Sequence, residues 1–275
     1  MANFTVAKAR MAVIPATVAL WPAWERHIKF GLDSFVVGLA LFVFLCAWYV
    51  YEQRKISADE PATFGFMVAA WLLLVIYIMT FGRVPPLGGQ VLATEIVACA
   101  LLASYPPVLV RRRLAYLALC PLTLPLETAL QFVIGYPFRR ISAEAVGVLL
   151  SPYGVVIKGT TLIYGGSPLE VDAACSGVLG LWALLIIGAL ISLFSRYGWS
   201  AFLSTMTCAA VASLGYNILR TSLLFLYRFH RGVESTGMHS LLGGIAFVVT
   251  VTAFVAVARK GSTMWPVARK GCYQA

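Results

Sequence analysis

Three residues of different chemical types, Cys175, Arg220 and His239, could together perform acyl transfer. A cysteine thiolate attacks a carbonyl carbon, an imidazole moves protons, and a guanidinium stabilises the charge that develops on the carbonyl oxygen. The three residues are far apart in the sequence. Their chemistry therefore depends on the elements that would bring them together.

Taken singly, each residue also has a structural interpretation. Cys175, in LEVDAACSGVLGL, stands where a helix N-terminus would favour its thiolate, but lone cysteines in apolar surroundings are more often packing residues. His239 precedes an apolar stretch, where histidine commonly caps a helix or faces water. Arg220 lies inside an apolar stretch, where an arginine needs a partner or a cavity unless it extends to the membrane surface.

The composition indicates an integral membrane protein. Hydrophobic residues make up 60% of the 275 residues and charged residues only 12%, against about 25% in soluble domains. The segments 64–82, 173–195 and 240–258 contain no charged residue, and each is close to the roughly 20 residues that cross a bilayer. The net charge of +10 comes from basic residues scattered between apolar blocks, such as Arg111–Arg113, which favours lipid headgroups over nucleic acid.

The fold predicted from these blocks is an all-α, polytopic helical bundle with about eight transmembrane helices in one membrane domain, 1–275. Within it we expect N-terminal helices (1–134), an extracytoplasmic segment (135–173), catalytic helices (174–258) and a cytoplasmic tail (259–275). The first crossing is short and contains two prolines. The expected crossings are 11–24, 34–51, 64–82, 91–110, 114–134, 174–195, 201–226 and 240–258.

The extracytoplasmic segment precedes Cys175 directly. Its first half, ISAEAVGVLLSPYG, predicts a short amphipathic helix on the membrane, and its second half, rich in Val, Thr and Gly, predicts a hairpin or an extended loop. Lys and Arg are more frequent on the side of the N-terminus, which predicts a cytoplasmic N-terminus. With that topology Cys175, Arg220 and His239 all lie near the outer face.

Three short blocks then resemble the exosortase/archaeosortase family: VDAACSG around Cys175, NILR ending at Arg220, and GMHSLLGG around His239. They occur in the family's order, each at the expected end of a helix. The resemblance covers most of 120–258 well and the first 110 residues loosely. Near LDSFVVG the family often has a histidine that this chain lacks.

The resemblance implies a thiol protease of protein sorting, a hydrolase of peptide bonds that acts as a transpeptidase in the cytoplasmic (inner) membrane, with its active site facing outward. Its substrates would be membrane-anchored proteins whose C-terminal signal combines a motif such as Pro-Glu-Pro, an apolar helix and a basic cluster. The acceptor would be an exopolysaccharide or a lipid of the cell surface. Cys175 would be the nucleophile, His239 the acid–base and Arg220 the oxyanion stabiliser.

Supporting roles follow for other residues. Ser176 and Gly177 are small and would let a substrate backbone approach, and Asn217, three residues before Arg220, would orient the guanidinium. Arg139, Arg140, Arg228 and Arg231 would bind an acidic residue of the substrate or contact headgroups.

Four carboxylates have no assigned role. Glu170 and Asp172 would orient His239 or border the membrane, and Glu127 would pair with Arg220 or serve structure, while Glu95 lies in another span. The other cysteines, Cys46, Cys99, Cys120, Cys208 and Cys272, show no metal-ligand spacing, and we expect neither metal nor cofactor.

Other functions stay open at this point. A protease that only hydrolyses would use the same three residues, and a solute transporter would explain the carboxylates in the spans. Against a transporter, the two halves of the chain show no repeat, and the polar residues gather near one face. A scaffold without catalysis would leave the Cys, Arg and His set unexplained.

Overall fold

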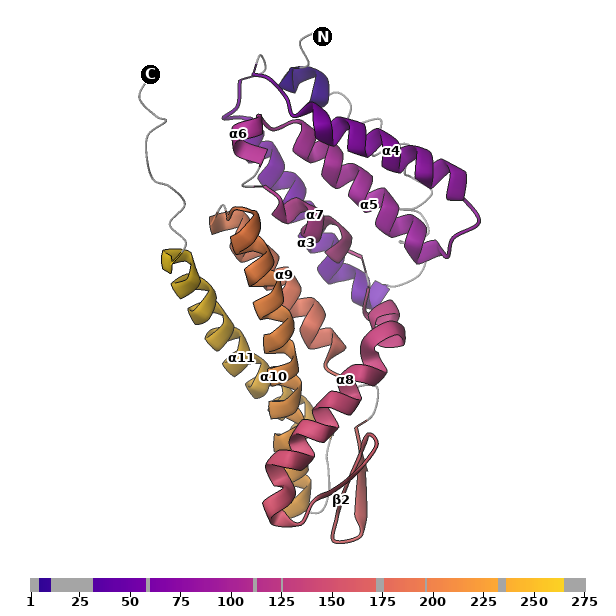
Figure 1. Cartoon of the computed structure of the whole chain (residues 1–275), viewed down its shortest axis with the longest axis vertical. Helices are drawn as coiled ribbons and strands as arrows, with labels where there is room; N and C mark the ends of the chain where they lie inside the picture. Colours follow the sequence, from indigo (N-terminus) through magenta and orange to yellow (C-terminus); the bar gives the residue numbers. More distant parts are fainter. Residues whose placement is uncertain are drawn as a thin grey trace. The chain divides into compact units, whose positions relative to one another are not determined.

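A computed structural model describes most of the chain, and its ordered elements are almost all helices (Figure 1). By the packing of the backbone the chain divides into two units, formed by residues 1–125, 189–202 and 267–275, and by residues 126–188 and 203–266. The described residues are 5–10, 32–57, 60–110, 113–124, 126–171, 176–195, 197–231 and 236–264.

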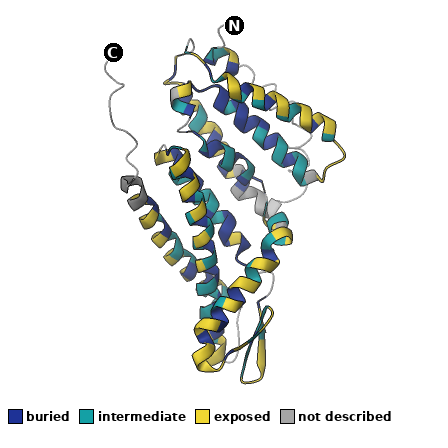
Figure 2. Cartoon of the chain, viewed as in Figure 1, coloured by how far each residue is buried: buried dark blue, intermediate teal, exposed yellow. Residues whose placement is uncertain are grey.

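The first unit contains the helices α3 (Leu32–Gln53), α4 (Phe64–Thr80), α5 (Pro86–Ala103), α6 (Pro107–Val110) and α7 (Ala115–Leu122). α4 packs on α5 through a cluster centred on Tyr77, Ile96 and Val97. Much of the surface of α4 is exposed (Figure 2). Large apolar residues lie on it, among them Trp71 and Met79, which are 61% and 70% exposed. An exposed apolar face of this extent is what contact with lipid requires.

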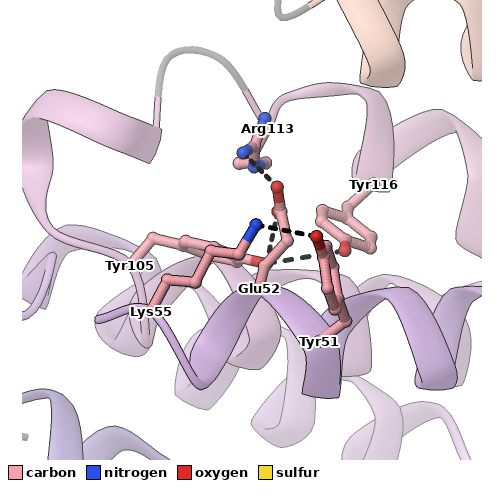
Figure 3. A network of polar contacts seen from close by, with 6 residues as sticks. All are labelled: Tyr51, Glu52, Lys55, Tyr105, Arg113 and Tyr116. Atoms are coloured by element: carbon pink, nitrogen blue, oxygen red, sulfur yellow. Dashed lines mark hydrogen bonds and ion pairs between the residues drawn. The ribbon is translucent and has the colours of Figure 1, made fainter. Parts of the chain in front are cut away.

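A buried polar network ties the end of α3 to the segment around α6 and α7 (Figure 3). Arg113 pairs with Glu52, both buried, and the Tyr105 hydroxyl donates to the other oxygen of Glu52 at 3.2 Å. The sequence predicted that Arg113 contacts lipid headgroups together with its basic neighbours. This prediction was wrong, because the residue is only 4% exposed and pairs with the carboxylate of Glu52 inside the protein.

The second unit begins with α8 (Glu127–Leu150), followed by the 3-10 turn η1 (Ser151–Tyr153). The strands β1 (Val156–Lys158), β2 (Thr161–Tyr164) and β3 (Ser167–Glu170) form an antiparallel sheet in the order β1-β2-β3. α8, β2 and α10 share a core that includes Val146, Leu162 and Phe225. The expected hairpin is therefore one of three strands, and the expected short helix is the second half of a long one.

Three long helices follow: α9 (Val178–Ser195), α10 (Trp199–Arg231), which contains Arg220, and α11 (Thr236–Met264), which contains His239. By length and composition, these are the three described helices able to span a membrane, whereas parts of α3, α4 and α5 are shorter apolar helices. The predicted crossing 11–24 lies outside the described residues. The predicted crossing 114–134 was wrong, since α7 ends at Leu122 and α8 begins at Glu127.

Candidate functional site

Arg220 and His239 meet inside the second unit. Arg220 Nη2 lies 2.7 Å from His239 Nε2. A guanidinium has no acceptor, so Arg220 donates and the imidazole accepts at Nε2, which requires a neutral histidine with its proton on Nδ1. The predicted convergence of α10 and α11 is therefore present at the level of side-chain atoms.

The positions of these two residues on their helices differ from the prediction. α10 continues to Arg231, so Arg220 lies three turns before its end, and α11 begins at Thr236, so His239 lies within its first turn. Gly243 follows His239 by four residues and faces the same way, because a Cβ there would lie 3.1 Å from Arg220 Nε. The His-x-x-x-Gly spacing thus supplies a hydrogen-bond acceptor at His239 and, four residues later, a position without a side chain at Gly243. Together they let the Arg220 guanidinium approach α11.

A cavity of about 520 Å³ opens beside this pair. Its wall includes Arg220 and His239, the aromatic rings of Tyr216 and Phe247, which pack edge to face, and Ser176 and Gly177 from the start of α9. Cys175 itself lies outside the described residues. The two residues that directly follow it in the chain face the same cavity as the arginine and the histidine.

Two glycines let α9 approach α10 closely. Gly177 has φ +79°, and a Cβ there would lie 2.6 Å from Asn217 Cγ. At Gly180 a Cβ would lie 2.5 Å from the ring of Tyr216. At either position a Cβ would force the start of α9 or the contacting side chain of α10 to move.

Asn217 has a different contact from the one expected. Its Nδ2 donates to Ser142 Oγ of α8 at 2.8 Å, and its Oδ1 is buried without a hydrogen-bond partner among the described residues. No hydrogen bond joins it to Arg220. Asn217 therefore supports the Ser176–Gly177 segment and α8, and the guanidinium is held by α11.

The arginines expected to bind substrate lie elsewhere in the unit. Arg140 pairs with the exposed Glu144 at 2.8 Å, and the Arg139 Nε donates to the Gly135 carbonyl at 3.4 Å. Arg228 lines a second cavity of about 360 Å³ between α10 and the sheet. Arg231 is the last residue of α10, and its side chain is not described.

The unassigned carboxylates separate into two groups. Glu127, at the start of α8, lines the Arg220–His239 cavity, although no ion pair between Glu127 and Arg220 occurs in the described part of the chain. Glu170 is exposed at the end of β3 and does not line that cavity, and Asp172 lies outside the described residues. Glu95 belongs to α5 of the other unit.

Sequence reasoning missed Gln131 and Ser142, two polar residues of α8 that contact the segment around Ser176 and the residue Asn217. The only available signal was a polar side chain in a largely apolar stretch. Such a signal does not name a partner, because the partner is contributed by another helix.

Described helices long and apolar enough to span a membrane, together with an arginine–histidine pair at one cavity, are typical of an integral membrane protein. Comparison with known families identifies the group: residues 14–256 match the transmembrane exosortase family (Exosortase_EpsH), and the chain belongs to this family. No curated protein and no solved structure matches the chain. Family membership and the apolar helices place the protein in a membrane and indicate a sorting transpeptidase that acts on protein substrates.

Proposed function

We propose that this protein cleaves the C-terminal sorting signals of exported proteins at the outer face of the cytoplasmic membrane and transfers them to a cell-surface acceptor. The observation that carries the proposal is the 2.7 Å contact between Arg220 and His239 in a cavity whose wall includes Ser176 and Gly177. Cys175 is the nucleophile, His239 the acid–base and Arg220 the oxyanion stabiliser.

In the first step the Cys175 sulfur bonds to the scissile carbonyl carbon, and the carbon–nitrogen bond breaks. His239 takes the proton of the Cys175 thiol at Nε2 and gives it to the departing amine, which leaves with the apolar helix of the substrate. In the second step an acceptor hydroxyl or amine attacks the thioester, and the carbon–sulfur bond breaks. His239 takes the proton of the acceptor and returns it to the Cys175 sulfur, which restores the thiol and the neutral imidazole. A water molecule in place of the acceptor would give hydrolysis instead.

The contact between Arg220 and His239 has a consequence for this sequence. While Nη2 donates to Nε2, that nitrogen cannot carry the proton that the leaving amine needs. When negative charge develops on the carbonyl oxygen, the guanidinium has a stronger acceptor and releases the imidazole. Stabilisation of the oxyanion and activation of His239 are therefore coupled through one arginine. Loss of a donor to an oxyanion costs about 10²–10³ in rate.

Arg228 is the basic residue best placed to bind an acidic side chain of the substrate. It lines a cavity together with Tyr164 and Phe229, whose rings pack edge to face with centroids 4.3 Å apart. We expect Arg228→Ala to raise KM for a substrate with an acidic motif and to leave KM unchanged for one whose acidic residue is replaced by its amide. An equal rise for both substrates would exclude this role. Arg140→Ala is the control, because Arg140 lies in an exposed pair with Glu144 on α8 and does not line this cavity.

The test of the proposal uses cells that contain the full-length protein and a reporter. The reporter is an exported domain followed by a short motif, an apolar helix and a basic cluster. Cys175→Ala should abolish reporter cleavage while the protein still inserts in the membrane, whereas Cys208→Ala, at a half-buried thiol in α10, should not. Undiminished cleavage by the Cys175→Ala protein would exclude a cysteine nucleophile.

A second measurement separates transfer from hydrolysis. Mass spectrometry of the cleaved reporter would find an adduct on its new C-terminus after transfer and a free carboxylate after hydrolysis. A thioester on Cys175 that hydroxylamine releases would identify the intermediate. A free carboxylate under all conditions would limit the activity to that of a protease.

A further inference from the structure

The Ser176–Gly177 segment, which follows Cys175, is held by a side chain outside the cavity. The Ser176 hydroxyl donates to Gln131 Oε1 at 2.6 Å and accepts from the Val178 backbone N–H at 3.3 Å. The second contact caps the N-terminus of α9. The first contact directs the hydroxyl proton of Ser176 toward Gln131. The lone pairs of the same oxygen are then free to accept from the first N–H of α9.

Gln131 is itself held in one place. Its amide lies over Gly135, one turn further along α8, where a Cβ would come within 2.7–2.9 Å of three amide atoms. Gly135 is buried, so this space is not shared with solvent. Because residue 135 has no side chain, α8 leaves room for the Gln131 amide to lie where it accepts the hydrogen bond from Ser176.

α10 also contacts the Ser176–Gly177 segment. The fully buried side chain of Asn217 packs against Gly177, and its Nδ2 donates to the fully buried Ser142 of α8. α8 thus reaches the start of α9 by two routes, directly through Gln131 and indirectly through Ser142 and Asn217. A segment needed only for packing would not require two polar routes, because buried polar groups gain little net stability over apolar ones.

We propose that Gln131 is a positioning residue for Cys175, which acts through the Ser176 hydroxyl and does not touch the substrate. This inference rests on the proposed role of Cys175 as nucleophile. Gln131 does not line the Arg220–His239 cavity. Its hydrogen bond holds the residue directly after the cysteine, and a displacement of a reacting group by about 1 Å costs roughly 10²-fold in rate.

The test uses the full-length protein in proteoliposomes with the reporter substrate. Gln131→Met keeps the length of the side chain and removes the acceptor, and should lower kcat about 10- to 100-fold with KM within about twofold of the unchanged protein. Ser176→Ala should give a similar loss. The double variant should lose no more than either single variant, because both remove the same hydrogen bond. Gln90→Met, at a buried glutamine of α5, is the matched control and should keep full activity.

A second readout does not depend on turnover. In a variant whose other five cysteines are replaced by alanine, alkylation of Cys175 by iodoacetamide at pH 7 should slow about tenfold when Gln131 is changed to Met, because the Ser176 hydroxyl, directly after the cysteine, is no longer held by Gln131. An unchanged kcat and alkylation rate, or losses that multiply in the double variant, would overturn the positioning role. If Cys175→Ala keeps full turnover, the proposed function fails instead, and the alkylation rates still test the positioning by Gln131.

Discussion

Gly177→Ala is the substitution that most directly tests the packing of the cysteine segment. The added Cβ would lie 2.6 Å from Asn217 Cγ and 2.7 Å from Asn217 Cβ, distances at which one partner must move. An alanine at φ +79° costs about 1–2 kcal/mol in backbone strain. The clash adds about 1–3 kcal/mol of overpacking. Loss of the hydrogen bond to Ser142 adds about 1 kcal/mol.

Gly154→Ala provides the matched control for this prediction. Gly154 has φ +82°, and a Cβ there would have no atom within 4 Å. It therefore carries the backbone strain of about 1–2 kcal/mol without the clash. The free energy of unfolding, measured by SDS titration in mixed micelles, should fall by about 3–6 kcal/mol for Gly177→Ala and by about 1–2 kcal/mol for Gly154→Ala. Equal losses would refute the close contact between the start of α9 and Asn217.

The remaining predictions concern one helix contact and one ion pair. Gly243→Ala should lower reporter turnover roughly three- to tenfold, because a Cβ 3.1 Å from Arg220 Nε displaces the guanidinium by a few tenths of an ångström. Gly215→Ala is the control and should have no effect, because Gly215 is exposed in α10, has open space around its Cβ and does not line the cavity. Equal turnover by both variants would contradict this account. Glu52→Gln should lower the free energy of unfolding by about 3–5 kcal/mol, since it removes the carboxylate charge that faces the buried guanidinium of Arg113. Glu144→Gln, in an exposed pair, should cost below about 1 kcal/mol in the same SDS titration, and similar losses for the two glutamates would contradict the burial of the first.

Long uncharged blocks were sufficient to predict helices in the sequence. The predicted crossings 34–51, 64–82 and 174–195 coincide with α3, α4 and α9. Their bounds follow from apolar side chains alone, because a membrane helix satisfies its backbone hydrogen bonds internally. Which of them span the bilayer depends on tertiary packing and lipid, which composition does not specify.

The prediction failed around α8 because hydropathy does not register backbone breaks. The apolar run 114–134 contains Pro125 in its sequence, and the residue before a proline disfavours helical geometry. In the structure α7 ends at Leu122 and α8 begins at Glu127. Conversely, the predicted crossing ended at residue 134, yet α8 continues through Pro137 and the two arginines that follow it to Leu150. A proline costs one hydrogen bond of a helix, and packing of α8 on β2 and α10 outweighs that cost.

The spacing between Asn217 and Arg220 in the block NILR has a physical reason. In NILR, Asn217 and Arg220 are three residues apart and therefore project about 60° apart around α10. Asn217 contacts α8 and the start of α9, whereas Arg220 contacts α11. A single turn of α10 thus holds the segment after Cys175 on one side and His239 on the other. Shortening the interval by one residue would turn the guanidinium roughly 100° away from His239, so the interval between these two residues is as important as their identity.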